Sequence, residues 1–210
     1  MKHLLFTVVI FSFSQFCGFS QQKQENNMMK KALIMIDIQN DYFENGSMTL
    51  VGAEEASLNA RKVLDIFRSE GLPVIYIQHL ATSPKATFFL PQTVGAEIHE
   101  NIKPTANEKV IIKHYPNSFR ETELLEYLKS MNITDLVICG MMTHMCVDAT
   151  VRAAKDLGFN CNVVSDACAT RDLTINGETV NAAEVQKSFL AAFNGFYALV
   201  KTTKEYLEEK

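Results

Sequence analysis

ITDLVICGMMTHMCVDATV, residues 133–151, is the stretch that decides the fold. Residues 136–139 form an apolar run between an aspartate and a glycine, which is typical of a buried strand. Apolar residues then recur at helical spacing until Gly158. Cys146 therefore begins a helix directly after a strand, where free backbone N–H groups and the helix dipole favour a thiolate, so we expect its pKa to lie below about 8.5. The alternative is that Cys146 is only a small packed hydrophobe.

The first thirty residues differ in kind from the rest of the chain. Lys2 and His3 precede an apolar run at 4–13, and small residues at positions 18 and 20 suit a cleavage site before Gln21. We predict a signal peptide at 1–20 and a polar tether at 21–30, with an uncleaved anchor as the alternative. The mature protein would then be periplasmic or secreted, with no membrane association.

Residues 31–210 suffice for one compact domain and leave little room for two. The net charge of −4 gives no basic footprint for nucleic acid. Four cysteines remain after the predicted cleavage, and in an exported protein an even number permits disulfides. This parity is weak evidence, because Cys139 and Cys161 lie inside predicted strands.

Apolar strands alternate with amphipathic helices along the domain. The predicted strands are 32–38, 74–78, 110–112, 136–139, 160–164 and 196–200, and the predicted helices are 53–69, 121–131, the segment from 143 to Gly158, and 180–193. This alternation indicates an α/β fold, a doubly wound parallel sheet with helices on both faces. The connection at 79–95 has no clear period, and a connection of that length is usually functional.

Three reactive side chains are predicted at the carboxyl edge of this sheet, where such folds bind ligands. Asp37 ends the first strand, Lys113 ends the third, and Cys146 follows the fourth. A charged group in an apolar strand is costly unless it is paired. The pair of Asp37 and Lys113 is therefore either catalytic or a purely structural ion pair.

Four segments in order resemble the isochorismatase-like cysteine hydrolases, which include nicotinamidases, N-carbamoylsarcosine amidases, ureidoacrylate hydrolases and streptothricin hydrolases. The segments are ALIMIDIQNDYF, KVIIKHYPNSF, LVICGMMTHMCVDATVRAAKDLGF and VVSDACAT, within residues 31–207. The resemblance implies a six-stranded sheet of order 3-2-1-4-5-6, a catalytic triad of Asp37, Lys113 and Cys146, and a cis peptide bond between Met141 and Met142.

The implied chemistry is hydrolysis of a non-peptide C–N bond, amide or ureide, in a small molecule. Asp37 would accept the thiol proton, Lys113 would order the carboxylate, and Cys146 would form a thioester. The backbone N–H groups of Met142 and Cys146 would form the oxyanion hole. The alternatives are a vinyl-ether hydrolase of the isochorismatase type, for which Cys146 is dispensable, and a catalytically silent binding domain.

No metal or other cofactor is expected. The nicotinamidase branch holds a metal through an aspartate and two histidines, whereas residues 41–52 contain no histidine, and the isolated His79 and His99 lack ligand spacing. Apolar or neighbouring side chains supply the candidate substrate pocket, with simple packing as the alternative: Phe43, His79, Phe88, Phe89, Tyr115, Phe119 and His144. The resemblance also implies a homodimer or homotetramer.

Overall fold

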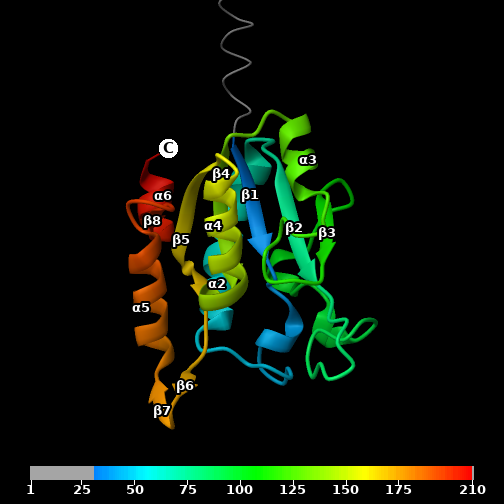
Figure 1. Cartoon of the computed structure of the whole chain (residues 1–210). Helices are drawn as coiled ribbons and strands as arrows, with labels where there is room; N and C mark the ends of the chain where they lie inside the picture. Colours follow the sequence, from blue (N-terminus) through cyan, green and yellow to red (C-terminus); the bar gives the residue numbers. More distant parts are fainter. Residues whose placement is uncertain (1–30, 210) are drawn as a thin grey trace, which may run out of the picture.

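The structure of the chain, a computed structural model, describes residues 31–209 (Figure 1). The predicted signal peptide, 1–20, and the predicted tether, 21–30, lie outside the described residues. None of the helices in residues 31–209 is both long and apolar enough to cross a membrane.

The core of the fold is a six-stranded parallel sheet of order β3-β2-β1-β4-β5-β8. Its strands are β1 (Lys31–Ile36), β2 (Val74–His79), β3 (Lys109–Lys113), β4 (Asp135–Met141), β5 (Asn160–Ala169) and β8 (Leu199–Lys201). Because β8 takes the place of the predicted sixth strand, the predicted doubly wound sheet and its order are confirmed.

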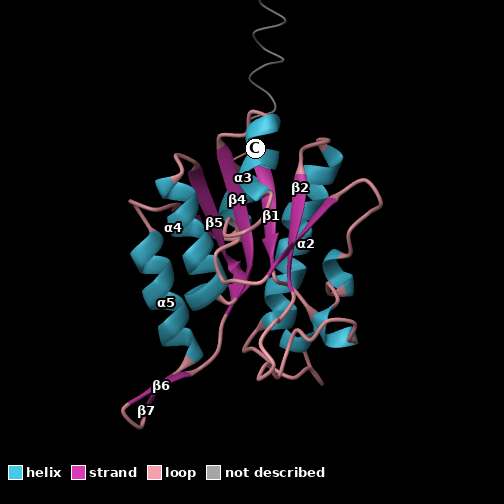
Figure 2. Cartoon of the chain, turned by 45° about the vertical axis from the view of Figure 1, so that its right-hand side comes forward, coloured by secondary structure: helices cyan, strands magenta, loops and turns pink. Residues whose placement is uncertain are grey.

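Helices cover both faces of the sheet, as Figures 1 and 2 show. They are α2 (Ala53–Ser69), α3 (Leu124–Ser130), α4 (Asp148–Asp156), α5 (Ala182–Phe193) and α6 (Thr203–Glu208). In β1, Leu33 and Met35 pack in the cluster that contains α2 and α6, whereas Ile34 and Ile36 pack in the cluster that contains α3, α4 and α5. Alternate residues of a strand point to opposite faces, so a strand buried on both sides is apolar throughout.

Single helical turns shape the connections near the carboxyl edge of the sheet. Three are 3-10 turns, η1 (Asn40–Tyr42), η2 (Val94–Ala96) and η3 (Glu100–Ile102). The fourth, η4 (Thr143–Val147), is a π-helical turn that leads directly into α4. Cys146 thus lies at the start of a helical segment, as predicted.

Several predicted strand boundaries were wrong. β1 ends at Ile36, because Asp37 has a φ of +50° and leaves the extended conformation. β5 continues to Ala169 past a register shift against β4. The last strand begins at Leu199 instead of residue 196, because Gly195, with φ +92°, closes a turn by donating its N–H to the carbonyl of Ala198.

Two further elements were not predicted. β6 (Leu173–Ile175) and β7 (Glu178–Val180) form an antiparallel hairpin that projects from the body (Figure 2). Its Asn176-Gly177 turn has positive φ at both residues, as a type I′ hairpin turn requires. Helix α6 begins at a capping box between Thr202 and Glu205.

Gly140 allows β4 to lie unusually close to β1 at the carboxyl edge. A Cβ atom on this residue would lie 2.1 Å from the carbonyl oxygen of Ile36, and its φ of +143° also disfavours other residues. Ile36 and Gly140 are register partners. Their close approach brings the segment that carries Cys146 against the end of β1.

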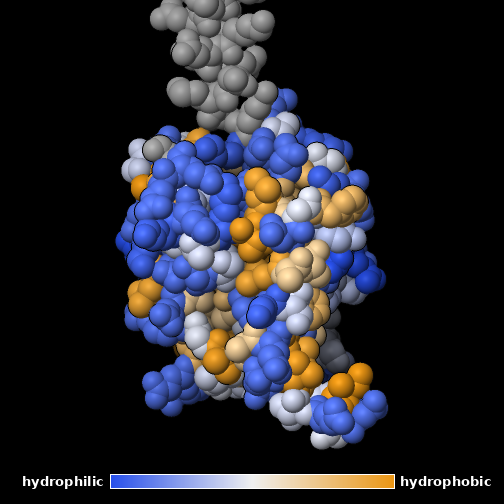
Figure 3. Space-filling model, turned by 90° about the vertical axis from the view of Figure 1, so that its left-hand side faces the viewer, coloured by the Kyte–Doolittle hydropathy of each residue, from blue (hydrophilic) through white to orange (hydrophobic). Residues whose placement is uncertain are grey.

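The edge of the sheet at β8 lies on the side shown in Figure 3, where apolar residues are exposed among polar ones. Phe196 and Leu199, from this strand and the turn before it, are 69% and 54% exposed. With three residues, β8 is a short edge strand, which limits pairing with other chains.

Candidate active site

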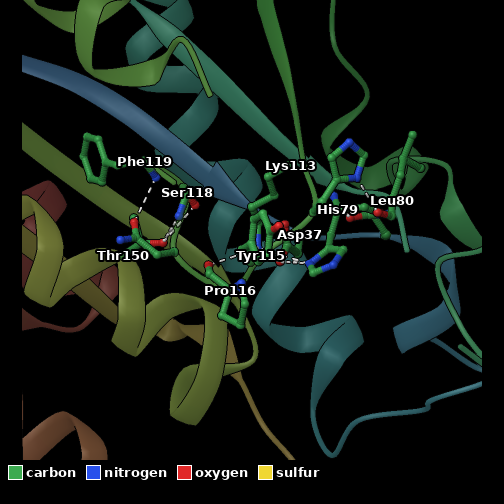
Figure 4. A network of polar contacts seen from close by, with 12 residues as sticks. Asp37, His79, Leu80, Lys113, Tyr115, Pro116, Ser118, Phe119 and Thr150 are labelled. Carbon is green, nitrogen blue, oxygen red and sulfur yellow. Dashed lines mark hydrogen bonds and ion pairs between the residues drawn. The ribbon is translucent and has the colours of Figure 1, made fainter. Parts of the chain in front are cut away.

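The ends of three adjacent strands bring polar side chains together at the carboxyl edge of the sheet (Figure 4). Asp37 follows β1, His79 ends β2 and Lys113 ends β3. His79 and Lys113 are register partners, and the N–H of Asp37 donates to the carbonyl of Ile77 at 3.0 Å. Parallel pairing therefore aligns the three residues side by side.

Lys113 is the centre of the polar network. Its Nζ lies 2.8 Å from Oδ2 of Asp37, and it donates to Nδ1 of His79 at 3.3 Å and to the carbonyls of Tyr115 and Pro116 at 3.0 and 3.1 Å. The side chains of Lys113 and Asp37 are fully buried. Burial alone would lower the pKa of Lys113, but the negative charge of Asp37 outweighs it and raises that pKa, so the ammonium stays protonated.

The carboxylate of Asp37 is charge-paired but has unused acceptor capacity. Among residues 31–209, no group gives either of its oxygens a well-aligned hydrogen bond, although Nζ of Lys113 is in ion-pair contact. The three N–H bonds of the ammonium account for this, because their three hydrogen-bond acceptors lie elsewhere. A carboxylate in this state can accept a proton.

Cys146 lies next to this carboxylate and is 2% exposed. Its Sγ, a carboxylate oxygen of Asp37 and a ring nitrogen of His79 all lie within 4.8 Å of one another. Burial and then the charge of Asp37 raise the pKa of the Cys146 thiol, and Lys113 only partly opposes them. The predicted low pKa is wrong for this site, because burial outweighs the helix start. The resting residue is therefore a neutral thiol.

His79 completes the group and is neutral. Burial lowers its pKa, against the opposing effect of Asp37. Its backbone is held by Gln39, whose side chain accepts from the N–H of His79 at 2.7 Å and donates to its carbonyl at 2.9 Å. Gln39 is fully buried and was not predicted as a site residue. It lies three residues after the last residue of β1, and its amide ties this segment to the end of β2.

The predicted pocket residues divide between the site and other places. Phe88, Phe89 and His79 lie together with Tyr42, which was not predicted as a site residue. The ring centroids of Tyr42 and Phe89 are 4.7 Å apart, and Tyr42 interacts electrostatically with Cys146 and Asp37. These aromatic rings form one wall beside the reactive groups.

Three other predicted pocket residues do not present their rings to the reactive groups. Phe43 stacks on His99 and lines a separate surface hollow of about 460 Å³. Phe119 stacks on Phe159 in the apolar cluster of α3, α4 and α5, and Figure 4 shows it far from Asp37. Tyr115 contributes its carbonyl to Lys113, while its ring packs under Arg120.

His144 is half-buried two residues before Cys146, and Nδ1 of its ring lies 2.6 Å from the hydroxyl of Thr170. Arg171 follows Thr170 and interacts electrostatically with His144 and with Tyr42. Its Nε is buried and has no hydrogen-bond partner among the described residues. A loop arginine gives no periodic signal in a sequence, so it was not predicted.

The peptide bond between Met141 and Met142 is cis, as the resemblance implied.

A second surface hollow of about 510 Å³ lies between α2, β5 and α5. The residues that line the two surface hollows do not include Asp37, Lys113 or Cys146. The reactive groups therefore lie beneath the surface, behind the aromatic side chains.

The donors of Asp37, His79 and Cys146 are of the types that bind a transition metal. Lys113 already places a cation 2.8 Å from Oδ2 of Asp37 and uses the Nδ1 lone pair of His79. A metal ion would have to displace this ammonium, so these residues do not fit a resident metal.

Comparison with known proteins gives concordant matches. The family model of the isochorismatase domain matches residues 31–201. The isochorismatase family protein YddQ of Bacillus subtilis is 51% identical over 180 residues, which are 86% of this chain and all of the relative. A streptothricin hydrolase of Streptomyces noursei is 31% identical over 143 residues, 68% of this chain and 51% of its own length.

Solved structures share the fold. An isochorismatase from Pseudomonas putida superposes with a TM-score of 0.79 at 36% identity, covering 85% of this chain and 90% of its own. An N-carbamoylsarcosine amidase from Thermoplasma acidophilum gives a TM-score of 0.70 at 28% identity, covering 83% and 97% of the two chains.

Proposed function

This chain belongs to the isochorismatase family of hydrolases, and from that premise we propose that it cleaves a non-peptide C–N bond, amide or ureide, in a small molecule through a Cys146 thioester. Relatives in the family include amidohydrolases, among them a streptothricin hydrolase, a nicotinamidase and an N-carbamoylsarcosine amidase. The observation that carries the proposal is a buried thiol beside a carboxylate that lacks an aligned hydrogen bond.

The reaction begins when the thiol of Cys146 passes its proton to Asp37 and its sulfur attacks the substrate carbonyl carbon. The backbone N–H groups of Met142 and Cys146 stabilise the oxyanion, a contribution of about 3 to 4 kcal/mol in comparable sites. Asp37 then protonates the leaving ammonia or amine. Lys113 stabilises the charged carboxylate of Asp37 before the first of these steps and after the second.

Water completes the cycle. Asp37 takes a proton from the water as the water oxygen attacks the thioester carbonyl. The bond between the carbonyl carbon and the sulfur then breaks, Asp37 returns the proton to the sulfur, and the acid product leaves. A substrate group that accepts hydrogen bonds would also satisfy the buried Nε of Arg171, since no described residue does so. No step requires a metal or an organic cofactor.

A panel of small amides and ureides, assayed for ammonia release, tests the activity. Cys146→Ala should abolish turnover and leave the fold intact, because alanine removes only the sulfur. Cys161→Ala is the matched control, since Cys161 is a buried cysteine on β5 outside the site. Mass spectrometry of the quenched wild-type enzyme should show an acyl adduct on Cys146. Full turnover by Cys146→Ala would refute the cysteine mechanism, and no turnover of any panel member by the wild type would favour the silent binding domain.

We also propose that the protein is exported, on the sequence pattern of residues 1–20. Mass spectrometry of the protein from its native source reads the mature N-terminus. A chain that begins at Gln21 is expected, and one that begins at Met1 would contradict export by a cleaved signal.

A further inference from the structure

Lys113 must reach across a strand to pair with Asp37. Lys113 ends β3 and Asp37 follows β1, and β2 lies between them. Two strand spacings separate these positions, roughly 9.6 Å. The residue at the end of the intervening strand is His79, the register partner of Lys113. The ammonium therefore lies against the imidazole on its way to the carboxylate (Figure 4).

The hydrogen bonds of Lys113 are fully distributed. An ammonium has three N–H donors, and here they go to the carbonyls of Tyr115 and Pro116 and to Nδ1 of His79. Asp37 has the closest contact, at 2.8 Å, yet neither of its oxygens receives an aligned hydrogen bond from the described residues. Four acceptors therefore compete for three N–H donors, and the three neutral acceptors are better aligned with the ammonium than the Asp37 carboxylate is.

We propose that His79 is a positioning residue that takes up the third N–H of Lys113, so that Asp37 keeps free lone pairs to accept the thiol proton of Cys146. This role rests on the proposed function, in which Asp37 is the base. A hydrogen bond to an ionised carboxylate favours the charged form and weakens it as a base. If His79 could not accept, the free N–H of Lys113 would turn to Asp37, the next acceptor.

The form of His79 required for this role is the neutral one. Nδ1 must be unprotonated to accept, so the ring proton lies on Nε2. The charged and titratable groups that act on His79 are Asp37 after β1, Lys113 and His114 at the end of β3, and Cys146 in η4. Burial lowers the pKa of His79, so the accepting form is present above that pKa and is lost as the pH falls through it.

Gln39 fixes the backbone that carries the imidazole of His79. Its side chain holds both the N–H and the carbonyl of His79, and its amide also donates to the carbonyl of Ala96 at 2.8 Å. A fully buried side chain with three such bonds leaves the end of β2 little freedom. The hydrogen bond of 3.3 Å between Nζ of Lys113 and Nδ1 of His79 is therefore formed with a well-fixed backbone at His79.

Three variants of the full chain separate the role from mere packing. His79→Asn keeps an acceptor oxygen near the Nδ1 position and does not titrate, whereas His79→Leu fills similar space without an acceptor. His114→Asn removes the neighbouring exposed histidine, whose Nδ1 contacts the carbonyl of Leu80, and serves as the control. Circular dichroism verifies that each variant is folded.

The first measurement needs no substrate. The infrared S–H stretching band of Cys146, assigned by its loss in Cys146→Ala, reports how strongly the nearby Asp37 carboxylate attracts the thiol proton. The band should lie at the same frequency in wild type, His79→Asn and His114→Asn, and should move toward the free-thiol frequency in His79→Leu. An unmoved band in His79→Leu would overturn the proposal even if no amide were ever turned over.

Nitrogen NMR of ¹⁵N-histidine protein should also show His79 protonated on Nε2 at neutral pH, and protonation on Nδ1 would overturn the proposal equally.

The second measurement uses hydrolysis of an amide that the panel identifies. His79→Leu should lower kcat roughly tenfold with little change in KM, because the loss lies in proton transfer. His79→Asn should retain the neutral-pH rate and move the acid limb of the pH profile to lower pH. A wild-type acid limb in His79→Asn, or a His79→Leu effect on KM alone, would show that His79 is structural or a substrate contact.

Discussion

Replacing Lys113 by methionine tests how strongly the free energy of unfolding depends on charge pairing between Lys113 and Asp37. Both partners are fully buried and their charges are 2.8 Å apart, so the variant leaves Asp37 as an uncompensated buried carboxylate. Removing one partner of such a pair costs about 3 to 5 kcal/mol. Methionine keeps most of the aliphatic stem, so the loss reports the charge rather than a cavity.

The double variant Asp37→Asn/Lys113→Met should recover most of this loss, because it removes both charges. Asparagine tolerates the φ of +50° at position 37, where a branched apolar residue would be strained. Urea unfolding at pH 7.5 gives the free energies of unfolding. Lys129→Met is the control, since Lys129 and Glu126 form a largely exposed pair at 3.5 Å, and a change within about 0.5 kcal/mol is expected. A Lys113→Met loss no larger than the control, or a double variant as unstable as the single one, would refute the reasoning.

Three further predictions concern the metal, the backbone and the pH dependence of stability. Chelators should leave hydrolysis unchanged. A loss of activity that zinc restores would contradict the conclusion that Asp37, His79 and Cys146 do not hold a resident metal. Gly140→Ala should cost at least about 3 kcal/mol of unfolding free energy, since its Cβ would lie 2.1 Å from a backbone oxygen, whereas Gly177→Ala, with open space around it, should cost about 1 kcal/mol. Partial burial alone would raise the pKa of Glu108, but hydrogen bonds from Arg68 and a backbone N–H lower it to about 2. Because the folded pKa lies below the unfolded value of 4.5, wild-type stability should fall as the pH drops from 4.5 to 2, and urea titrations of Glu108→Gln should show a flatter profile in that window.

The sheet and three of the reactive residues could be predicted because their signals are local. Strands buried on both faces are apolar throughout, so Asp37 and Lys113 stand out at their ends. Gln39 and Arg171 could not be predicted, since polar residues in connections show no periodicity. Their roles depend on which strand end or loop lies opposite, and that information is tertiary.

The positions of the aromatic rings and the pKa of the Cys146 thiol also depend on tertiary packing, so they could not be predicted from the sequence. In the sequence, Phe43, Phe88 and Phe119 are equally good candidates for pocket residues. The structure shows that, of these three, only Phe88 packs beside the reactive groups. The thiol pKa was wrong because a helix start is visible in the sequence, whereas the near-complete burial of Cys146 is not. Local electrostatics alone therefore gave the wrong direction.

The parallel sheet also determines which edge of the molecule faces solution when the chain is immobilised or fused at its N-terminal side. Lys31 begins β1 at the amino edge, and six residues of strand, roughly 20 Å, separate it from the carboxyl edge where Asp37 lies. The last described helix, α6, lies at the amino edge as well (Figure 1). A bead, sensor surface or fused partner joined before Lys31 would therefore hold the enzyme with its reactive edge facing outward into solution.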